Sequence, residues 1–399
     1  MAQSQRTIAE MMIRREVPHR RSARVRTGHG PVRLIPYLVA VVAMTASCGG
    51  DKGDSFPRVL TKSGPQWIRL ETTVLADPNG RQIGIPIGLA VGNRDGDYYV
   101  ADRLFGTVWR FGRAGNFIQG YGGLRRGRAS TRNVAGVAVV GDSVLLFDIG
   151  IARIQIFGRM TGRLLGSADL IGVPSLNLQG SGSKLRFGTH VDGGRGGLFV
   201  WDPTDGAAKR IGDVPSIFGR LPVLEHFNSI PIAQWGDSIV VGFGPLRALL
   251  VGSEAGGWTD TVYLPVSRRR GLAVQTLSDR QATRSELLNS SSFLGALHEL
   301  SDGDILAIHY DYIVDEAHPS AMPAKLYGTV IDRDHRTACV DGKLPDELAT
   351  QPRVAFRGDT VVIVGKKLVK PGAVTVVSRW TLTMEDCEWV HLPSWTGMW

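Results

Sequence analysis

Residues 87–120 decide the fold, and they read Ile87-Gly-Leu-Ala-Val91, Asp95-Gly-Asp97, Tyr98-Tyr-Val-Ala-Asp102, Thr107-Val-Trp-Arg-Phe111, Arg113-Ala-Gly115 and Asn116-Phe-Ile-Gln-Gly120. The second and fifth of these pieces are turns that contain glycine, and the other four are short strands rich in apolar and aromatic side chains. Short strands that follow one another across tight turns pair as antiparallel neighbours. The stretch therefore predicts one four-stranded antiparallel sheet.

The same unit recurs five more times along the chain. The strongest copy spans residues 136–165, where Ile154 and Ile156 alternate with Arg153 and Gln155 at the period of a half-buried strand. In the weaker copies we predict the first two strands at Leu185–Val191 and Leu198–Asp202, Pro231–Trp235 and Ser238–Val241, Leu294–Leu300 and Ile305–Ile308, and Arg353–Phe356 and Thr360–Val364. Six such units, about 55 residues apart, predict an all-β six-bladed propeller of four-stranded antiparallel blades over residues 66–399.

The composition agrees with this fold. Fifty of the 399 residues are glycine, well above the usual share of about 7%, as a turn-rich chain requires. A parallel sheet is excluded because the helical crossovers that it needs are missing. Residues 66–75 read as an extra strand, which would pair with the last blade and close the ring. Residues 266–293 lack a strand pattern, and Ser278 with Gln281 fits a capping box, so we predict a short helical insertion between blades four and five.

The pieces Gly88-Leu-Ala-Val91, Tyr99-Val-Ala-Asp102 and Val108-Trp-Arg-Phe111 resemble the NHL-type repeat. The mature chain resembles the six-bladed β-propeller lipoproteins of bacteria, most strongly over residues 87–165. This resemblance implies the fold and an exported, membrane-attached protein. It implies little about activity, because blades are architectural units that carry many functions.

The first 47 residues read as a lipoprotein-type signal peptide. An arginine-rich start precedes the apolar run 34–46, which is too short to span a bilayer comfortably and suits the core of a signal peptide. Ala46-Ser47-Cys48 resembles a lipobox, so we expect lipid on Cys48, a flexible tether over residues 48–65, and a cell-envelope location (the periplasmic face or the outer membrane). Thr45 stands where leucine or valine is usual, which leaves ordinary signal cleavage or an uncleaved anchor as alternatives.

The distribution of charge limits the kinds of partner that we expect. The leader holds eight arginines and two glutamates, which account for +6 of the net charge of +9, so the remainder carries only +3. A nucleic-acid partner needs a basic stripe on the folded domain, and we expect none. We expect a monomer.

In an oxidising compartment Cys339 and Cys387 form an even pair, so we predict a disulfide between them in the last blade, with two free thiols as the alternative.

The loops that join second to third strands and successive blades emerge on one face, where propellers usually carry their sites. Acidic residues recur where we predict that second strands end, and a mixed-charge rim suits a peptide, a glycan or a partner protein. The alternative for these acids is that they cap their own turns by accepting backbone N–H bonds. The candidate ligand-face residues are Asp102, Arg103, Asp148, Arg153, Asp202, His309 and Asp311.

Catalysis is the second hypothesis. Asp311, Asp315 and His318 lie in the longest predicted loop and are candidate ligands for Zn²⁺ or Ca²⁺, although their spacing matches no known ligand pattern, and we predict no cofactor. The inner strands offer mainly His190, Gln234, His298 and Glu299. We therefore expect a non-catalytic, membrane-tethered binding propeller; the alternative is a metal-dependent hydrolase or lyase of the gluconolactonase-like type.

Overall fold

The computed structural model describes most of the predicted propeller. Residues 1–62, which contain the predicted leader, Cys48 and nearly all of the tether, lie outside the described residues, as do Asp315 and His318. The described residues are 63–76, 80, 82–124, 127, 129–170, 172–175, 178–181, 183–190, 196–203, 208–214, 229–244, 246–255, 257–266, 268, 288–313, 324–345, 350–370 and 372–393.

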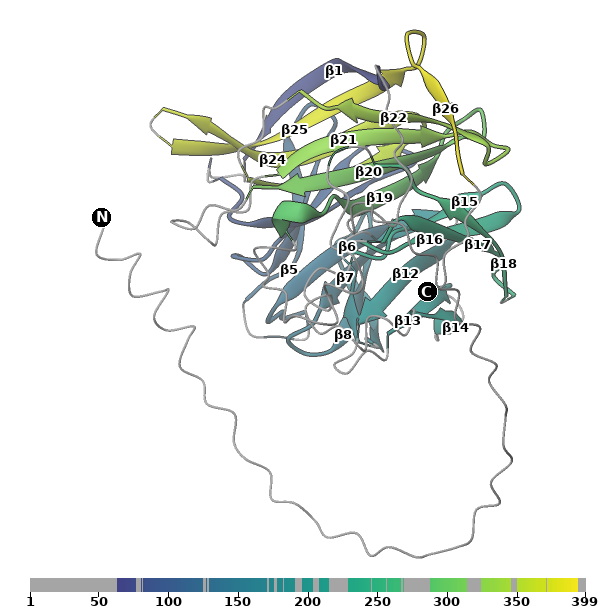
Figure 1. Ribbon diagram of the computed structural model, residues 1–399. Coiled ribbons are helices and arrows are strands. Elements are labelled where there is room, and N and C mark those ends of the chain that lie inside the picture. Colours follow the sequence, from purple (N-terminus) through teal and green to yellow (C-terminus); the bar gives the residue numbers. More distant parts are fainter. Residues whose placement is uncertain are drawn as a thin grey trace, which may run out of the picture. The chain divides into compact units, whose positions relative to one another are not determined.

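The strands form six antiparallel sheets, the blades of a six-bladed propeller (Figure 1). Blade one is β2 (Pro86–Val91), β3 (Tyr98–Asp102), β4 (Thr107–Phe111) and β5 (Phe117–Gly122); blade two is β6 (Val134–Val140), β7 (Ser143–Asp148), β8 (Arg153–Gly158) and β9 (Leu164–Asp169). Blade three is β10 (Val173–Pro174), β11 (Gln179–Ser181), β12 (Lys184–His190), β13 (Gly197–Trp201) and β14 (Ala208–Asp213).

The second half of the chain repeats the arrangement. Blade four is β15 (Ile232–Trp235), β16 (Ser238–Gly242), β17 (Ala248–Gly252) and β18 (Trp258–Tyr263). Blade five is β19 (Phe293–Glu299), β20 (Ile305–Tyr312), β21 (Ala324–Ile331), β22 (Thr337–Lys343) and β26 (Trp389–His391); blade six is β23 (Thr350–Arg357), β24 (Thr360–Val369), β25 (Gly372–Thr383) and β1 (Gln66–Leu75). The six predicted repeats thus correspond to the six blades.

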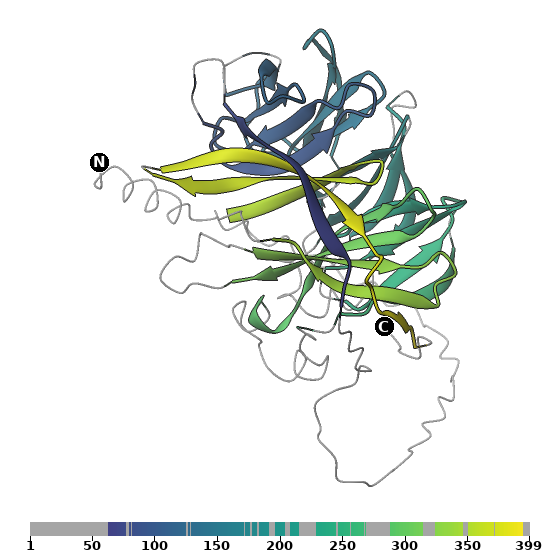
Figure 2. The ribbon, with the colours of Figure 1, turned by 90° about the horizontal axis from the view of Figure 1, so that it is seen from above.

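The first described strand closes the ring. Strand β1 pairs with β25 from Gln66 opposite Thr383 to Leu75 opposite Thr375, so the first described strand lies in one sheet with three strands from the last sixth of the chain (Figure 2). The prediction that residues 66–75 pair with the last blade is confirmed. This closure gives the last blade the outer strand that it lacks and covers an edge that would otherwise be exposed.

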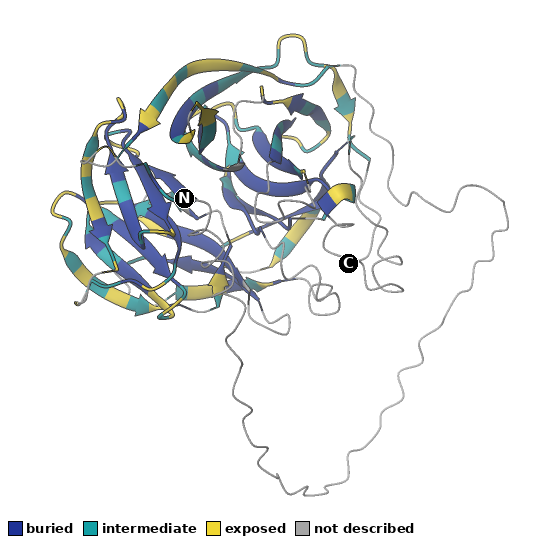
Figure 3. Cartoon of the chain, turned by 90° about the vertical axis from the view of Figure 1, so that its left-hand side faces the viewer, coloured by how far each residue is buried: buried dark blue, intermediate teal, exposed yellow. Residues whose placement is uncertain are grey.

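The core lies between neighbouring blades. Every residue of β3 is buried, because blade one is covered on both faces. Tyr98 packs into the cluster shared with blade six, which includes Val362, whereas Tyr99 packs into the cluster shared with blade two, which includes Val137. Alternate residues of one strand therefore pack in the interfaces with two different neighbouring blades. Buried strands make up most of the interior of the blades (Figure 3).

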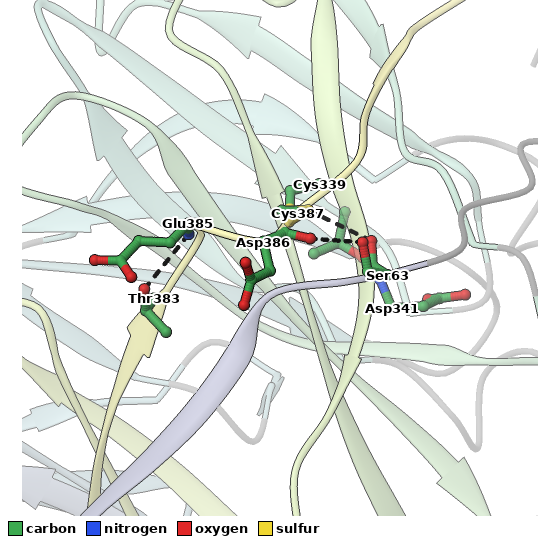
Figure 4. The surroundings of a disulfide bond; sticks show 8 residues. Ser63, Cys339, Asp341, Thr383, Glu385, Asp386 and Cys387 are labelled. Atoms are coloured by element: carbon green, nitrogen blue, oxygen red, sulfur yellow. Dashed lines mark hydrogen bonds between the residues drawn. A yellow bond between two sulfur atoms is a disulfide. The ribbon is translucent and has the colours of Figure 1, made fainter.

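A disulfide joins Cys339 and Cys387, as predicted, with their Cα atoms 6.0 Å apart. Its predicted place in the last blade is wrong. Cys339 lies on β22, the fourth strand of blade five, and Cys387 precedes β26, which pairs with β22 (Figure 4). The chain leaves blade six after β25 and returns to the edge of blade five, so the bridge fastens the end of the chain to its neighbour.

The predicted helical insertion falls mostly on residues outside those described. Of the segment 266–293, residue 267 and residues 269–287 are not described, and a single helical turn at Leu288–Ser290 precedes β19. Within the described ranges, no helix is long and apolar enough to cross a membrane.

Blade three differs from the predicted register. Its first strand is split into β10 and β11, and both pieces pair with β12. The segments that we predicted as first and second strands, Leu185–Val191 and Leu198–Asp202, are therefore the second and third. Pro174 lacks a backbone donor and the pieces are only two and three residues long, so no alternating apolar pattern marks the first strand.

Candidate functional site

The central channel has two ends that differ in how the chain turns. At one, here called the turn end, lie the tight turns from first to second and from third to fourth strands. At the other, the loop end, lie the connections from second to third strands and between blades. First strands of neighbouring blades contact one another around the channel: β2 contacts both β6 and β23, β6 contacts β11, and β19 contacts both β15 and β23. We predicted the ligand at the loop end.

Asp102 and Asp148 lie at the loop end, fully buried. The carboxylate of Asp102 accepts hydrogen bonds from the backbone N–H groups of Gly84 (2.7 Å), Ile85 (3.0 Å) and Leu104 (3.0 Å). The Asp102 carboxylate thus joins the segment that enters blade one to the turn that follows the second strand, β3. These contacts favour the capping role over a role in ligand binding.

Asp148 makes the same kind of contacts. It accepts from the N–H groups of Arg132 (2.7 Å), Asn133 (2.9 Å) and Gly150 (2.9 Å). Its equivalence to Asp102 was visible in the sequence, because both aspartates end a second strand.

The other predicted residues of the ligand face are dispersed. Arg103 and Arg153 are exposed at the loop end. Asp202 follows β13, a third strand, and therefore lies at the turn end, where it accepts a hydrogen bond from the Ser183 hydroxyl (3.1 Å). The expectation that Asp202 shares the register of Asp102 and Asp148 is wrong, and the split first strand of blade three is the reason.

His309 and Asp311 are buried between blades four and five. Asp311 accepts hydrogen bonds from Ser292 (2.6 Å) and from Arg268 (3.1 Å), and Arg268 also forms an ion pair with Asp341. Asp311, the one predicted metal ligand that is described, is thus already held by an arginine. Among the residues that can be described, no three His, Cys, Asp or Glu side chains group together in a way that could hold a metal ion.

The imidazole of His309 is 1% exposed, and within the described chain neither ring nitrogen has a hydrogen-bond partner. Burial, together with the charges of Arg268 and Arg247, holds the pKa of His309 well below 6.5. The unfolded chain therefore binds the proton more readily, and stability should fall as the pH drops below about 6.5, by up to about 1.4 kcal/mol per pH unit. Urea unfolding between pH 7 and 5 should show a steeper loss in the wild type than in His309→Phe; equal slopes would contradict this assignment.

A cavity of about 220 Å³ occupies the channel toward the turn end. Residues from all six blades line it, and most are apolar. Its polar members are Asn93, Gln234, His298 and Glu299. The structure therefore brings together three of the four inner-strand residues that the sequence suggested; His190 ends β12, a second strand, and its side chain is not described.

The polar side chains of the cavity are held in place by neighbouring blades. His298 bonds through Nε2 to the Gly358 carbonyl oxygen (2.8 Å), and its ring stacks on Phe356 with centroids 4.4 Å apart. Burial lowers the pKa of His298, which therefore stays neutral at pH 7. Glu299 accepts a hydrogen bond from the Gly236 N–H (2.6 Å). These contacts tie blade five to blades four and six and fix the rim of the channel.

A groove of about 650 Å³ continues from this rim between blades four and five. His298, Glu299 and Gly358 line both the groove and the cavity. The wall of the groove includes Trp235, whose indole donates to the Gly303 carbonyl (2.8 Å). The Trp235 ring also contacts the His335 ring, with centroids 4.0 Å apart and the planes tilted by 32°. Four carboxylates and one arginine line the groove: Asp237, Glu299, Asp302, Asp359 and Arg333.

Sequence reasoning missed most of this groove. Asp237, Asp302 and Asp359 lie in the Gly/Asp turns, which we used in the sequence only to mark where strands begin and end. The available signal was that each of these turns directly follows an inner strand, so its side chains must surround one end of the channel. The groove has net negative charge, whereas the chain as a whole is basic.

No protein-family model matches the sequence, and no curated protein is significantly similar to it. Solved structures do match. A member of the DUF4221 family from Bacteroides vulgatus has 11% identity and a TM-score of 0.58, over 81% of this chain and 99% of that one. A protein of Bacteroides fragilis described as exported has 9% identity and a TM-score of 0.51, over 78% and 95% of the two chains.

A gluconolactonase from Xanthomonas campestris has 12% identity and a TM-score of 0.47, over 82% of this chain and 99% of that one. The sheet topology makes the chain a six-bladed β-propeller, and the two matches from Bacteroides, at such low identities, show this fold alone.

Proposed function

We propose that the chain is an exported, membrane-tethered β-propeller that binds a basic peptide at the turn end of its channel and catalyses no reaction. One observation carries the proposal: among the described residues, four carboxylates and one arginine line the groove between blades four and five. Concave sites lined by charges of one sign concentrate ligands of the opposite sign. Because His298 stays neutral, its ring does not offset the carboxylates.

The groove also has the form that an extended peptide needs. It opens at the channel rim, and Asp237 and Asp302 are exposed on its two sides. Lysine or arginine side chains would pair with these carboxylates, while the peptide backbone lies along the turns of blades four and five. Such a complex should be weak and sensitive to salt, because exposed ion pairs are screened.

Titration of the full chain with a fluorescent tetralysine peptide tests the proposal. Asp237→Asn combined with Asp302→Asn should weaken binding by about two- to thirtyfold, since each of the two exposed ion pairs contributes roughly 0.2–1 kcal/mol. The matched control is Asp169→Asn, which removes an exposed carboxylate at the end of β9. Equal affinity of the wild type, the double variant and the control would contradict peptide binding in the groove. If the purified chain bound no peptide and contained stoichiometric metal, the hydrolase alternative would be favoured.

The membrane tether is a second part of the proposal, and it rests on Ala46-Ser47-Cys48 and the apolar run before it. Cells given radiolabelled palmitate should incorporate the label into the wild-type chain and not into Cys48→Ala. Equal labelling of the two chains would overturn lipidation at Cys48 and leave export by ordinary signal cleavage.

A further inference from the structure

The hairpin of β24 and β25 extends beyond the other strands of blade six. Pairing of β24 with β23 ends at Lys366, opposite Thr350, and pairing of β25 with β1 ends at Thr375, opposite Leu75. Strands β24 and β25 continue to pair with each other as far as Val369 and Gly372. The last part is therefore a two-stranded ribbon that projects from the loop end of blade six (Figures 1 and 2).

The tip of this ribbon is both apolar and basic. Leu368 is 74% exposed, more than any other large apolar side chain of the described residues, and Val369 is also exposed. Lys370 follows them and is exposed as well. An isolated two-stranded ribbon gains little stability from such side chains. Folding therefore does not account for an apolar tip that carries lysine.

Further apolar and basic side chains surround the foot of the ribbon. Lys366 donates a hydrogen bond to the Ile83 carbonyl, which joins the ribbon to the segment that enters blade one. In that region Ile85 and Leu104 are exposed, and a Cβ atom at Gly84 would lie 2.6 Å from Leu104. Arg103 is exposed beside Leu104, whereas the acid next to it, Asp102, is fully buried.

We propose that this hairpin surface (Ile85, Arg103, Leu104, Leu368, Val369 and Lys370) docks onto a bilayer that contains anionic phospholipid, with the ribbon tip among the headgroups. Exposed apolar side chains flanked by basic ones bind at the interface of such bilayers, and each basic residue near the surface strengthens binding roughly fivefold. The charge of the surface is complementary to phosphatidylglycerol. An acidic protein partner is the competing occupant, and the experiment below distinguishes the two.

The length of the tether permits this orientation. From Cys48 to Ser63 the chain can extend to about 50 Å, and the ten residues of β1 span about 33 Å. Strand β1 begins at the turn end, so a lipid on Cys48 can reach past the blade to a bilayer at the loop end. In this respect the inference rests on the proposed tether. Docking through the hairpin would turn the acidic groove away from the membrane and toward its ligand.

A fluorophore at the ribbon tip tests the inference. In the full chain with Cys48→Ser, Leu368→Cys provides one reactive thiol, because Cys339 and Cys387 are joined. The thiol is labelled with an environment-sensitive nitrobenzoxadiazole probe, and the chain is added to vesicles of phosphatidylcholine and phosphatidylglycerol in roughly a two-to-one ratio. The control is Leu165→Cys, at a leucine that is 63% exposed on β9 of blade two.

We expect a blue shift of the probe at position 368, and its quenching by brominated acyl chains, with no change at position 165. Vesicles of phosphatidylcholine alone, or the additional change Lys370→Gln, should reduce both signals. Unchanged emission at 368 on vesicle-bound chain, or equal shifts at both positions, would overturn the inference. A shift that requires added envelope protein would assign the surface to a protein partner instead. Tetralysine binding by Leu368→Cys reports separately on the groove.

Discussion

Replacing both Cys339 and Cys387 by alanine should lower the free energy of unfolding by about 4 kcal/mol. The bridge closes a loop with a sequence separation of 48 residues, and the chain-entropy account assigns a loop of that size a stabilisation of this order. It also fastens the segment that enters β26 to β22, the fourth strand of blade five. Guanidinium unfolding of the wild type and the double variant measures the difference.

Thiol counting on the denatured, unreduced chain is the control for this prediction. Neither Cys339 nor Cys387 should react before reduction, and both should react afterwards. Two reactive thiols before reduction, or a double variant as stable as the wild type, would contradict the bridge.

Asp148→Ala should lower the free energy of unfolding by about 3 kcal/mol. The change leaves three backbone N–H groups, on Arg132, Asn133 and Gly150, without the acceptor that they now share. Each buried donor left without a partner costs about 1–3 kcal/mol, less where water can enter. Asp148→Asn keeps one acceptor oxygen and should show a smaller loss. Urea unfolding at pH 7 measures both variants.

The matched control is Asp169→Ala in the same blade, where an exposed aspartate should change stability by no more than about 0.5 kcal/mol. Tetralysine binding by Asp148→Ala should remain intact below its unfolding midpoint. A variant of unchanged stability that no longer binds any ligand would restore Asp148 to the ligand face predicted from the sequence.

The fold was predictable because each blade buries both of its faces. Strands such as Tyr98–Asp102 are then buried throughout and mostly apolar, and the turns between them must carry glycine and aspartate. The closing strand at residues 66–75 was predictable for the same reason. Blade three was not predictable, because its first strand is divided after Pro174 into two pieces that contain too few residues to show a period. An error of one strand then placed Asp202 at the wrong end of the channel.

The candidate site was less predictable than the fold. A recurring aspartate at the end of a second strand has the same appearance in sequence whether it binds a ligand or caps a turn, and only the N–H groups around Asp102 and Asp148 distinguish the two. His298 and Glu299 were found because they lie on an inner strand. Arg333 and His335 were missed, since nothing local indicates that a turn after β21 borders the channel rim.

Hydrogen exchange of the full chain, with and without the tetralysine peptide, tests most directly whether the turn end is the ligand face. If the peptide binds at the turn end, exchange should become slower in residues 235–238 and 300–303, which border the groove between blades four and five. Exchange in residues 102–106 and 148–152, at the loop end, should stay the same. Slower exchange in the loop-end segments, with none in the groove, would contradict the account.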